Sequence, residues 1–288
     1  MSDKNKVIII SDTTSDLSDE LINRFDIKLV PLYITMGDST YKDRFEMAPD
    51  DIYSNYDKTG QLPKTAAGSV EDHRQMIEKY IGEGSGIVYF TISSKMSCNF
   101  NNARLAAEEY ENVYVVDSEN LSTGVGLSVL RAADMAAEGH TAEEIYNEIE
   151  KVKKRVDASF VVESLEYLKK GGRCSSIAAL GANLLKLRPC IVVRNGEMSV
   201  SKKYRGNMKT VLVLYAEDML SDLDNIEDDR IFITHSGCDK ENIDAVYDLV
   251  KSKNKFKEIF ITRAGCTVSS HCGYGTLGVL FIRKSEVK

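Results

Sequence analysis

The 288-residue chain lacks the short motifs that mark common nucleotide, metal and hydrolytic sites. It has no GxGxxG segment after its first predicted strand and no GxxxxGK[ST] segment, so neither dinucleotide binding nor a P-loop is supported. It also has no GxSxG elbow, no HExxH pair and no tight His/Asp/Glu cluster of the kind that holds a metal. These absences favour a binding protein over an enzyme.

Paired cysteines and long apolar runs are missing as well. The six cysteines are scattered without a CxxC pair, which suits reduced thiols better than a disulfide framework or a zinc site. No apolar run approaches the ~20 residues that cross a bilayer, and the few polar residues before the first predicted strand leave no room for a signal peptide. We therefore expect a soluble, cytoplasmic protein with no integral membrane segment.

The net charge argues against one class of partner. The formal charge of the chain is -7 at pH 7. Nucleic acid binding requires a basic surface, so nucleic acid is not expected to be the main partner.

One basic segment runs against this overall charge. Residues 165–210 carry ten Lys or Arg side chains and two acidic ones. The segment begins with a predicted short helix that stops at Gly171-Gly172, because glycine adopts the left-handed conformation at a helix end at little cost. Arg173 then lies on a tight turn. The local charge points to an anionic ligand or partner, and a solvated lysine-rich face is the alternative.

Strands and helices alternate over the first half of the chain. Short, continuously apolar runs are typical of buried parallel strands, and they occur at residues 7–10, 87–92 and 113–117, with a further strand predicted at 29–34. Helices are predicted between them, at residues 18–25, 69–81, 97–110, 123–138 and from 141 onward. This alternation predicts an α/β/α domain over residues 1–158, built on a parallel sheet covered on both faces.

The pattern changes beyond residue 158. Asn195-Gly196, flanked by two apolar-polar runs, is the strongest hairpin signal in the chain. Strands are predicted at 160–162, 231–234, 259–262 and 276–282, and helices at 177–187, 207–220 and 240–252. A hairpin among alternating elements predicts a mixed sheet, and so a second, two-layer α/β domain over residues 159–288. The linker near 157–159 is not rich in Gly or Pro, so we expect the two domains to pack as one body.

Hydroxyl side chains gather in three loops, at residues 11–15, 64–69 and 91–97. Free amides and the partial positive charge at a helix N-terminus let such loops hold a carboxylate or phosphate. Ordinary helix capping explains each loop taken singly, but three such loops together favour anion binding. Among the four histidines, His271 lies closest to glycines that allow a ligand to approach the backbone.

These motifs, in this order, resemble the DegV family of bacterial fatty-acid-binding proteins. The matching segments span nearly the whole chain, and the run at 165–175 is the most specific; they are residues 11–17, Thr65, 93–97, 116–118, 165–175, 203–205 and 271–275. The resemblance implies two α/β domains with one long-chain fatty acid between them, its carboxylate near the interface and its tail in an apolar tunnel. It also implies no cofactor, and a role in phospholipid metabolism as carrier for a dihydroxyacetone-kinase-like fatty acid kinase that phosphorylates the acyl group.

The resemblance also assigns roles residue by residue. Thr65 and Ser97 match the hydroxyls that bind the carboxylate, and His271 matches a histidine close to it. Arg173 and Arg205 match basic residues near the pocket mouth, for charge neutralisation or kinase docking. Ser93 and Ser94 match residues of the loop near this carboxylate site.

The chain departs from the family pattern at three places. Thr65 is followed by residues 66–68 (Ala-Ala-Gly) where the family usually has Ser-Gln-Pro. Cys98 replaces a usual glycine, and Tyr274 stands where proline is common. The head-group loop therefore has one hydroxyl and one side-chain amide fewer than its relatives.

Two other functions remain open on the residues alone. One is an acyl-ester hydrolase with Ser97 as nucleophile and His271 as base, and the other is a phosphate- or nucleotide-binding protein that uses the same helix N-termini. The carrier leads, because hydroxyls and helix amides can meet a buried carboxylate. The acyl tail of the bound fatty acid would add ~0.8 kcal/mol of binding free energy per buried methylene.

Overall fold

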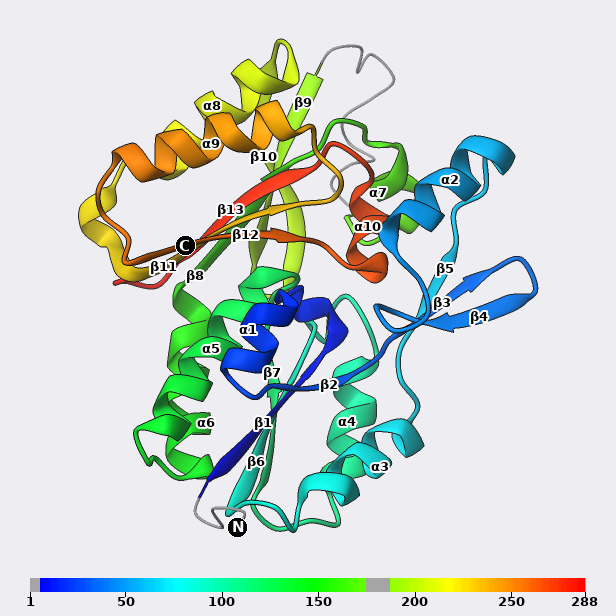
Figure 1. Ribbon diagram of the computed structural model, residues 1–288, viewed down its shortest axis with the longest axis vertical. Helices are drawn as coiled ribbons and strands as arrows, with labels where there is room; N and C mark the ends of the chain where they lie inside the picture. Colours follow the sequence, from blue (N-terminus) through cyan, green and yellow to red (C-terminus); the bar gives the residue numbers. More distant parts are fainter. Residues whose placement is uncertain (1–5, 175–186, 288) are drawn as a thin grey trace.

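The first of two large β-sheets is fully parallel (Figure 1). The computed structural model describes residues 6–174 and 187–287. The strands of this sheet lie in the order β2-β1-β6-β7 and are β1 (Val7–Asp12), β2 (Lys28–Val30), β6 (Gly86–Thr91) and β7 (Val113–Asp117). Strands β1 and β6 are buried along their whole length, as their continuous apolar sequence predicts.

Helices cover both faces of this sheet, because successive side chains of a strand point to opposite sides. Ile8 and Ile10 pack with α3 (Val70–Tyr80) and α4 (Asn99–Ala107). Val7 and Ile9 belong to the core that includes α1 (Asp19–Arg24), α5 (Thr123–Ala137) and α6 (Ala142–Val152). The predicted α/β/α arrangement is confirmed.

The second large sheet is mixed, as predicted. Its order is β10-β9-β8-β13-β11-β12, and only β11 and β12 pair in parallel. The strands are β8 (Val156–Val161), β9 (Leu187–Arg194), β10 (Glu197–Arg205), β11 (Ile226–His235), β12 (Glu258–Arg263) and β13 (Leu277–Arg283). The turn between β9 and β10 is Asn195-Gly196, with both residues at positive φ as this tight hairpin turn requires.

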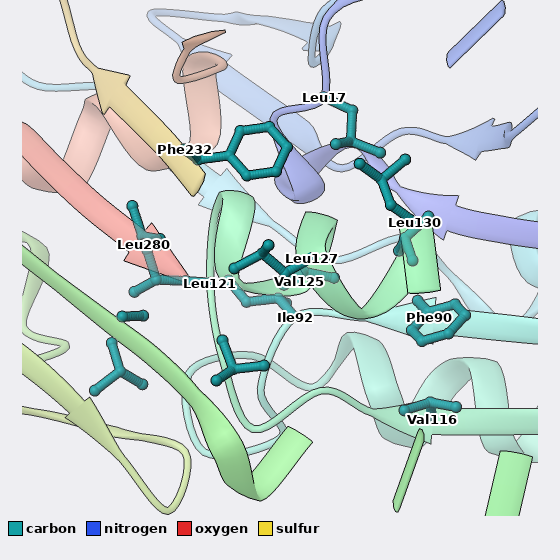
Figure 2. Packing of buried hydrophobic residues seen from close by; sticks show 14 of the residues in the cluster. Leu17, Phe90, Ile92, Val116, Leu121, Val125, Leu127, Leu130, Phe232 and Leu280 are labelled. Carbon is teal, nitrogen blue, oxygen red and sulfur yellow. The ribbon is translucent and has the colours of Figure 1, made fainter. Parts of the chain in front are cut away.

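One face of the mixed sheet is covered by α8 (Met208–Met219) and α9 (Lys240–Ser252) (Figure 1). The other face packs against α5, which is buried nearly all round and lies between the two sheets. Figure 2 shows Val125 and Leu127 of α5, with Leu121 just before the helix. Phe90 of the parallel sheet and Phe232 of the mixed sheet belong to the same cluster. The two sheets therefore share one hydrophobic core. The domain boundary at 158/159 stays a prediction, and strand β8 runs across it.

A third, small sheet was not predicted. The single strand expected at 29–34 is wrong: β2 ends at Val30, and the chain then forms an antiparallel sheet in the order β4-β3-β5. These strands are β3 (Tyr33–Met36), β4 (Ser39–Lys42) and β5 (Lys64–Ala66). The small sheet packs with three further helices, α2 (Pro49–Thr59), α7 (Glu166–Gly171) and α10 (Cys266–Cys272), around Ile34, Ile52 and Tyr167.

The remaining elements of the described residues are short. They are the 3-10 turns η1 (Thr13–Ser15), η2 (Lys153–Arg155) and η4 (Leu223–Asn225). Within residues 6–174 and 187–287, no helix combines the length and apolar character that crossing a membrane requires. The helix predicted at 177–187 lies almost wholly outside the described residues.

Two buried aspartates connect the start of α10 to the parallel sheet and to the small sheet. Asp16, in the loop after β1, accepts hydrogen bonds from the Gly265 amide at 2.8 Å and from the Ser122 hydroxyl. Asp43, after β4, accepts from the Cys266 amide at 2.8 Å and the Thr267 amide at 3.1 Å. The first amides of α10 are therefore satisfied by residues distant in the sequence.

Stability should fall in mildly alkaline solution because of Asp16. Burial raises the pKa of Asp16 to about 8, so the folded protein keeps a proton that the unfolded chain releases near the ordinary value of 3.8. The stabilisation from this proton is complete below pH 3.8 and is lost as the pH rises through 8. Between pH 7 and pH 8 the free energy of unfolding should fall by about 1 kcal/mol.

The variant Asp16→Asn should lack this decline, because asparagine is neutral and tolerates the left-handed φ of 50° at this position. Urea unfolding of both proteins at pH 7 and pH 8 provides the measurement. Asp12 and the histidines with lowered pKa values titrate below this window. Equal slopes in the two proteins would contradict the assignment to Asp16.

Candidate functional site

One cavity of about 390 Å³ opens between the loops of the parallel sheet, the small sheet and α10. This volume lies within the usual range for small-molecule sites. Its apolar lining comes from Leu32, Ala66, Ala67, Ile92, Met96, Leu121, Met198, Val268 and Cys272. Its polar lining comes from Thr65, Ser69, Ser97, Asn102, Arg173, Thr267 and His271, with Gly68 and Cys98 at the same loops.

His271 and Thr65 meet in this cavity although 206 residues separate them in the sequence. His271 Nε2 lies 2.9 Å from Thr65 Oγ1. Thr65 lies on β5, paired with Ile34 of β3, so the small sheet brings it to the site. His271 lies in the last turn of α10, a helix that was not predicted from the sequence.

Burial lowers the pKa of His271 to about 4, with a smaller contribution from the positive charge of Arg173. The imidazole is therefore neutral at pH 7. Its Nδ1 is buried and has no hydrogen-bond partner among the residues that the structure describes. Because a buried orphan N–H is rarer than a buried orphan acceptor, this assigns the proton to Nε2. Nε2–H then donates to Thr65 Oγ1, and the hydroxyl proton of Thr65 is left to donate to a group in the cavity.

The double glycine of α7 positions this histidine. A Cβ atom added to Gly171 would lie 2.3 Å from His271 Nδ1, so only glycine lets the ring occupy its place. Gly172 follows with φ of 67° and ends the helix, as the sequence predicts. Arg173 is exposed on the next turn, donates to the Gly171 carbonyl at 2.7 Å and lines the cavity.

Ser97 lies at the cavity wall just before α4. Its Oγ accepts a hydrogen bond from the Asn99 amide at 3.2 Å, so its own proton remains available to a ligand. The helix begins at Asn99, two residues later than predicted.

The other serines of this loop have structural contacts. Ser93 Oγ is buried and donates to the Gly196 carbonyl at 2.8 Å, which ties the loop to the β9–β10 hairpin. The Ser94 amide donates to Asp117 at 3.0 Å. Neither residue is among those that line the cavity.

Arg205 is not among the described residues that line the cavity. It is exposed at the end of β10, opposite Leu187 of β9. Thr65, Ser97, His271 and Arg173 thus share one cavity, and Arg205 lies outside it.

The first hydroxyl loop faces inward. Thr14 and Ser15 donate to the carboxylate and the carbonyl of Asp12, and Thr13 donates to Asp43 at 3.4 Å. Asp12 in turn accepts from the Ile92 amide and Asn99, each at 2.8 Å. This loop, considered above as an anion site, therefore stabilises the fold, and none of its residues lines the cavity.

Sequence reasoning missed Thr267, a further polar residue of the cavity. It lies four residues before His271 on α10, so the two share a helix face. A prediction of residues 266–272 as a helix would have placed Thr267 on the same face as His271. No local signal of the segment favours a helix.

Comparisons with known proteins agree with this architecture. A family model for uncharacterised proteins of the DegV family matches residues 6–284. A fatty acid-binding protein of Thermotoga maritima is 33% identical, over 95% of this chain and 96% of its own length. A DegV domain-containing protein of Clostridium acetobutylicum is 32% identical, over 97% of this chain and 99% of its own.

Solved structures show the same fold. A DegV family protein of Thermus thermophilus, described for its fatty acid binding, is 28% identical with a TM-score of 0.90, covering 96% of this chain and 99% of that one. DegV of Bacillus subtilis, described as a fatty acid binding protein, is 25% identical with a TM-score of 0.85, covering 97% and 99%. On the match along nearly its whole length, this chain belongs to the DegV family.

Proposed function

We propose that the chain binds a long-chain fatty acid, with its carboxylate at Thr65, Ser97 and His271 and its tail among the apolar residues of the cavity. The observation that carries this proposal is the 2.9 Å contact between Thr65 and His271 beside Ser97, in a cavity otherwise lined largely by apolar side chains. The Thermotoga and Thermus relatives, described as binding fatty acids, support it. The proposal involves no cofactor and places the carrier in the cytoplasm.

The chemistry of the cavity suits an amphipathic anion. A carboxylate removed from water needs several donors, and the hydroxyls of Thr65 and Ser97 can provide two. Arg173 adds positive charge at the cavity edge, where water screens it. The tail contributes ~0.8 kcal/mol per buried methylene, so it supplies most of the affinity.

Hydrolysis by Ser97 and His271 fits the geometry less well. Nε2 of His271 contacts Thr65, and no acid contacts its Nδ1 among the described residues. A base whose pKa is about 4 removes a serine proton poorly at neutral pH. A nucleotide site is disfavoured too, because the apolar lining offers few partners to a sugar or a second phosphate.

We further propose that the loaded protein presents its acyl group to a dihydroxyacetone-kinase-like fatty acid kinase. Exposed basic side chains on α7, on the turn that follows it and on β10 support a docking role; they are Lys169, Lys170, Arg173, Lys202, Lys203 and Arg205. Formation of acyl phosphate from the loaded protein, ATP and such a kinase is the measurement. No product with any such kinase of the same cell would contradict this step.

Protein purified from cells should carry a fatty acid, and delipidated protein should rebind one. Native mass spectrometry identifies the co-purified lipid, and calorimetry measures rebinding of palmitate. Delipidated, folded protein that binds no long-chain acid, or turnover of acyl esters that is lost in Ser97→Ala, would contradict the carrier.

Thr65→Ala and Ser97→Ala should each weaken fatty acid binding by about 1 kcal/mol, the usual net contribution of a hydrogen bond. Calorimetric Kd values test this. Ser94→Ala, in the same loop but outside the cavity wall, is the matched control and should bind normally. Unchanged affinity in both variants would remove these hydroxyls from the site.

Gly171→Ala should weaken binding about tenfold or more, because its Cβ displaces the His271 ring. Gly172→Ala is the matched control: nothing lies within 4 Å of its Cβ, and only its left-handed φ is strained. It should lose about 1–2 kcal/mol of stability and keep its affinity. Similar binding losses in the two variants would show that the glycines matter only for the turn.

A further inference from the structure

The loop between β5 and α3 has no polar side chain that could hold it in place. Its residues 66–68 are Ala-Ala-Gly, and all three line the cavity directly after Thr65. Strand β5, which carries Thr65, is a three-residue strand at the edge of the small sheet. Contacts from another element must therefore fix this part of the cavity wall.

Two asparagines of α4 hold the Gly68 peptide from both sides. The Gly68 amide donates to Asn99 Oδ1 at 3.0 Å, and Asn102 Nδ2 donates to the Gly68 carbonyl at 2.7 Å. The asparagines are three positions apart, so they share one face of the helix. With Asn99 alone the peptide would be held only at its N–H and could tilt, whereas the two bonds together fix its orientation.

Asn99 is itself held rigidly in the interior. It is fully buried, its Nδ2 donates to Asp12 at 2.8 Å, and its Oδ1 lies 3.1 Å from His73 Nε2. Because Asn99 Oδ1 is an acceptor, Nε2 of His73 carries the proton, and Nδ1 then accepts from the Tyr89 hydroxyl at 2.6 Å. Both ends of the Asn99 amide are therefore paired, which makes α4 a firm support for the loop.

The segment before the same helix carries the other hydroxyl of the site. Ser97 Oγ accepts from the Asn99 backbone amide at 3.2 Å, so it is positioned by the start of α4. Thr65 instead comes from the small sheet. The contacts at Gly68, three residues after Thr65, join these two parts of the cavity wall and so constrain the separation of the two hydroxyls.

We propose that Asn102 is a positioning residue of the carboxylate site. By holding the Gly68 carbonyl, it keeps Thr65 and Ser97 at the separation that the two oxygens of a carboxylate require. The proposal rests on the proposed fatty acid binding and goes beyond it by assigning head-group specificity to a residue that acts through the loop. A ligand with a single oxygen does not depend on this separation, because either hydroxyl can bind it.

The test compares myristate with 1-tetradecanol, which has the same tail length and a single oxygen. Both affinities are measured by displacement of a fluorescent fatty acid from delipidated protein. We expect Asn102→Ala to bind myristate about fivefold more weakly than the wild type and to bind 1-tetradecanol equally well. Equal losses for the two ligands, or no loss for either, would overturn the positioning role. Wild-type protein that does not bind myristate would overturn the proposed function itself.

Asn101 provides the matched control. It is the same residue type at the preceding position of α4, is exposed, and is not among the residues that line the cavity. Asn101→Ala should leave both affinities unchanged. A loss of myristate binding equal to that of Asn102→Ala would show a general response of the helix to substitution, and the proposal would be wrong.

The Ser97→Ala background separates positioning from direct contact. It leaves Thr65 as the single hydroxyl of the pair, so the separation of the two no longer matters. Asn102→Ala should then weaken myristate binding by less than about twofold, since residues that act together are not additive. A fivefold loss in both backgrounds would mean that Asn102 contacts the ligand itself, which would contradict a positioning role.

Discussion

The capping of α10 by buried carboxylates is the constraint on which the site depends. Asp16 and Asp43 bind the first amides of this helix from the loop after β1 and from the segment after β4. Burying a carboxylate is costly unless donors meet it. The amides and partial positive charge of the helix N-terminus supply such donors to Asp43, whereas burial raises the pKa of Asp16 to about 8 and keeps it protonated at neutral pH. The arrangement ties the parallel sheet, the small sheet and the mixed sheet to one short helix. It therefore fixes the two polar residues of α10 that line the cavity, Thr267 and His271.

The rest of the fold gives that helix a rigid frame. Because α5 packs against both large sheets, the two sheets share a single core and hold their loops in one relative position. Ile92 follows the end of β6 and Leu121 follows β7, so the cavity lies at the carboxyl ends of the parallel strands. Ligand sites in open α/β sheets lie at that edge as a rule. The small sheet then closes the cavity from the side and brings Thr65 to it.

The parts of this structure that were predictable have local causes. Continuous apolar runs predicted β1 and β6, Asn195-Gly196 predicted the hairpin, and the capping box at Thr141 predicted α6. The small sheet was missed because its strands are short and β4 and β5 are largely exposed, so they carry little apolar periodicity. Helix α10 was missed for a different reason: its N-terminus has no side-chain cap of its own, and its caps lie 249 and 223 residues away. The family resemblance proposed His271, whereas Thr267 required the helix itself.

The electrostatics of the site suit the proposed role of a carrier whose ligand would undergo phosphoryl transfer. The groups that face the proposed carboxylate are hydroxyls and a neutral imidazole, and the nearest cation that lines the cavity, Arg173, is exposed. A buried bidentate arginine would bind a carboxylate more strongly and hold both of its oxygens. Neutral donors leave more electron density on those oxygens and leave most of the affinity to the tail. A carboxylate held in this way keeps the nucleophilic character that phosphoryl transfer to it would require, whereas an ion pair in the cavity would oppose that step.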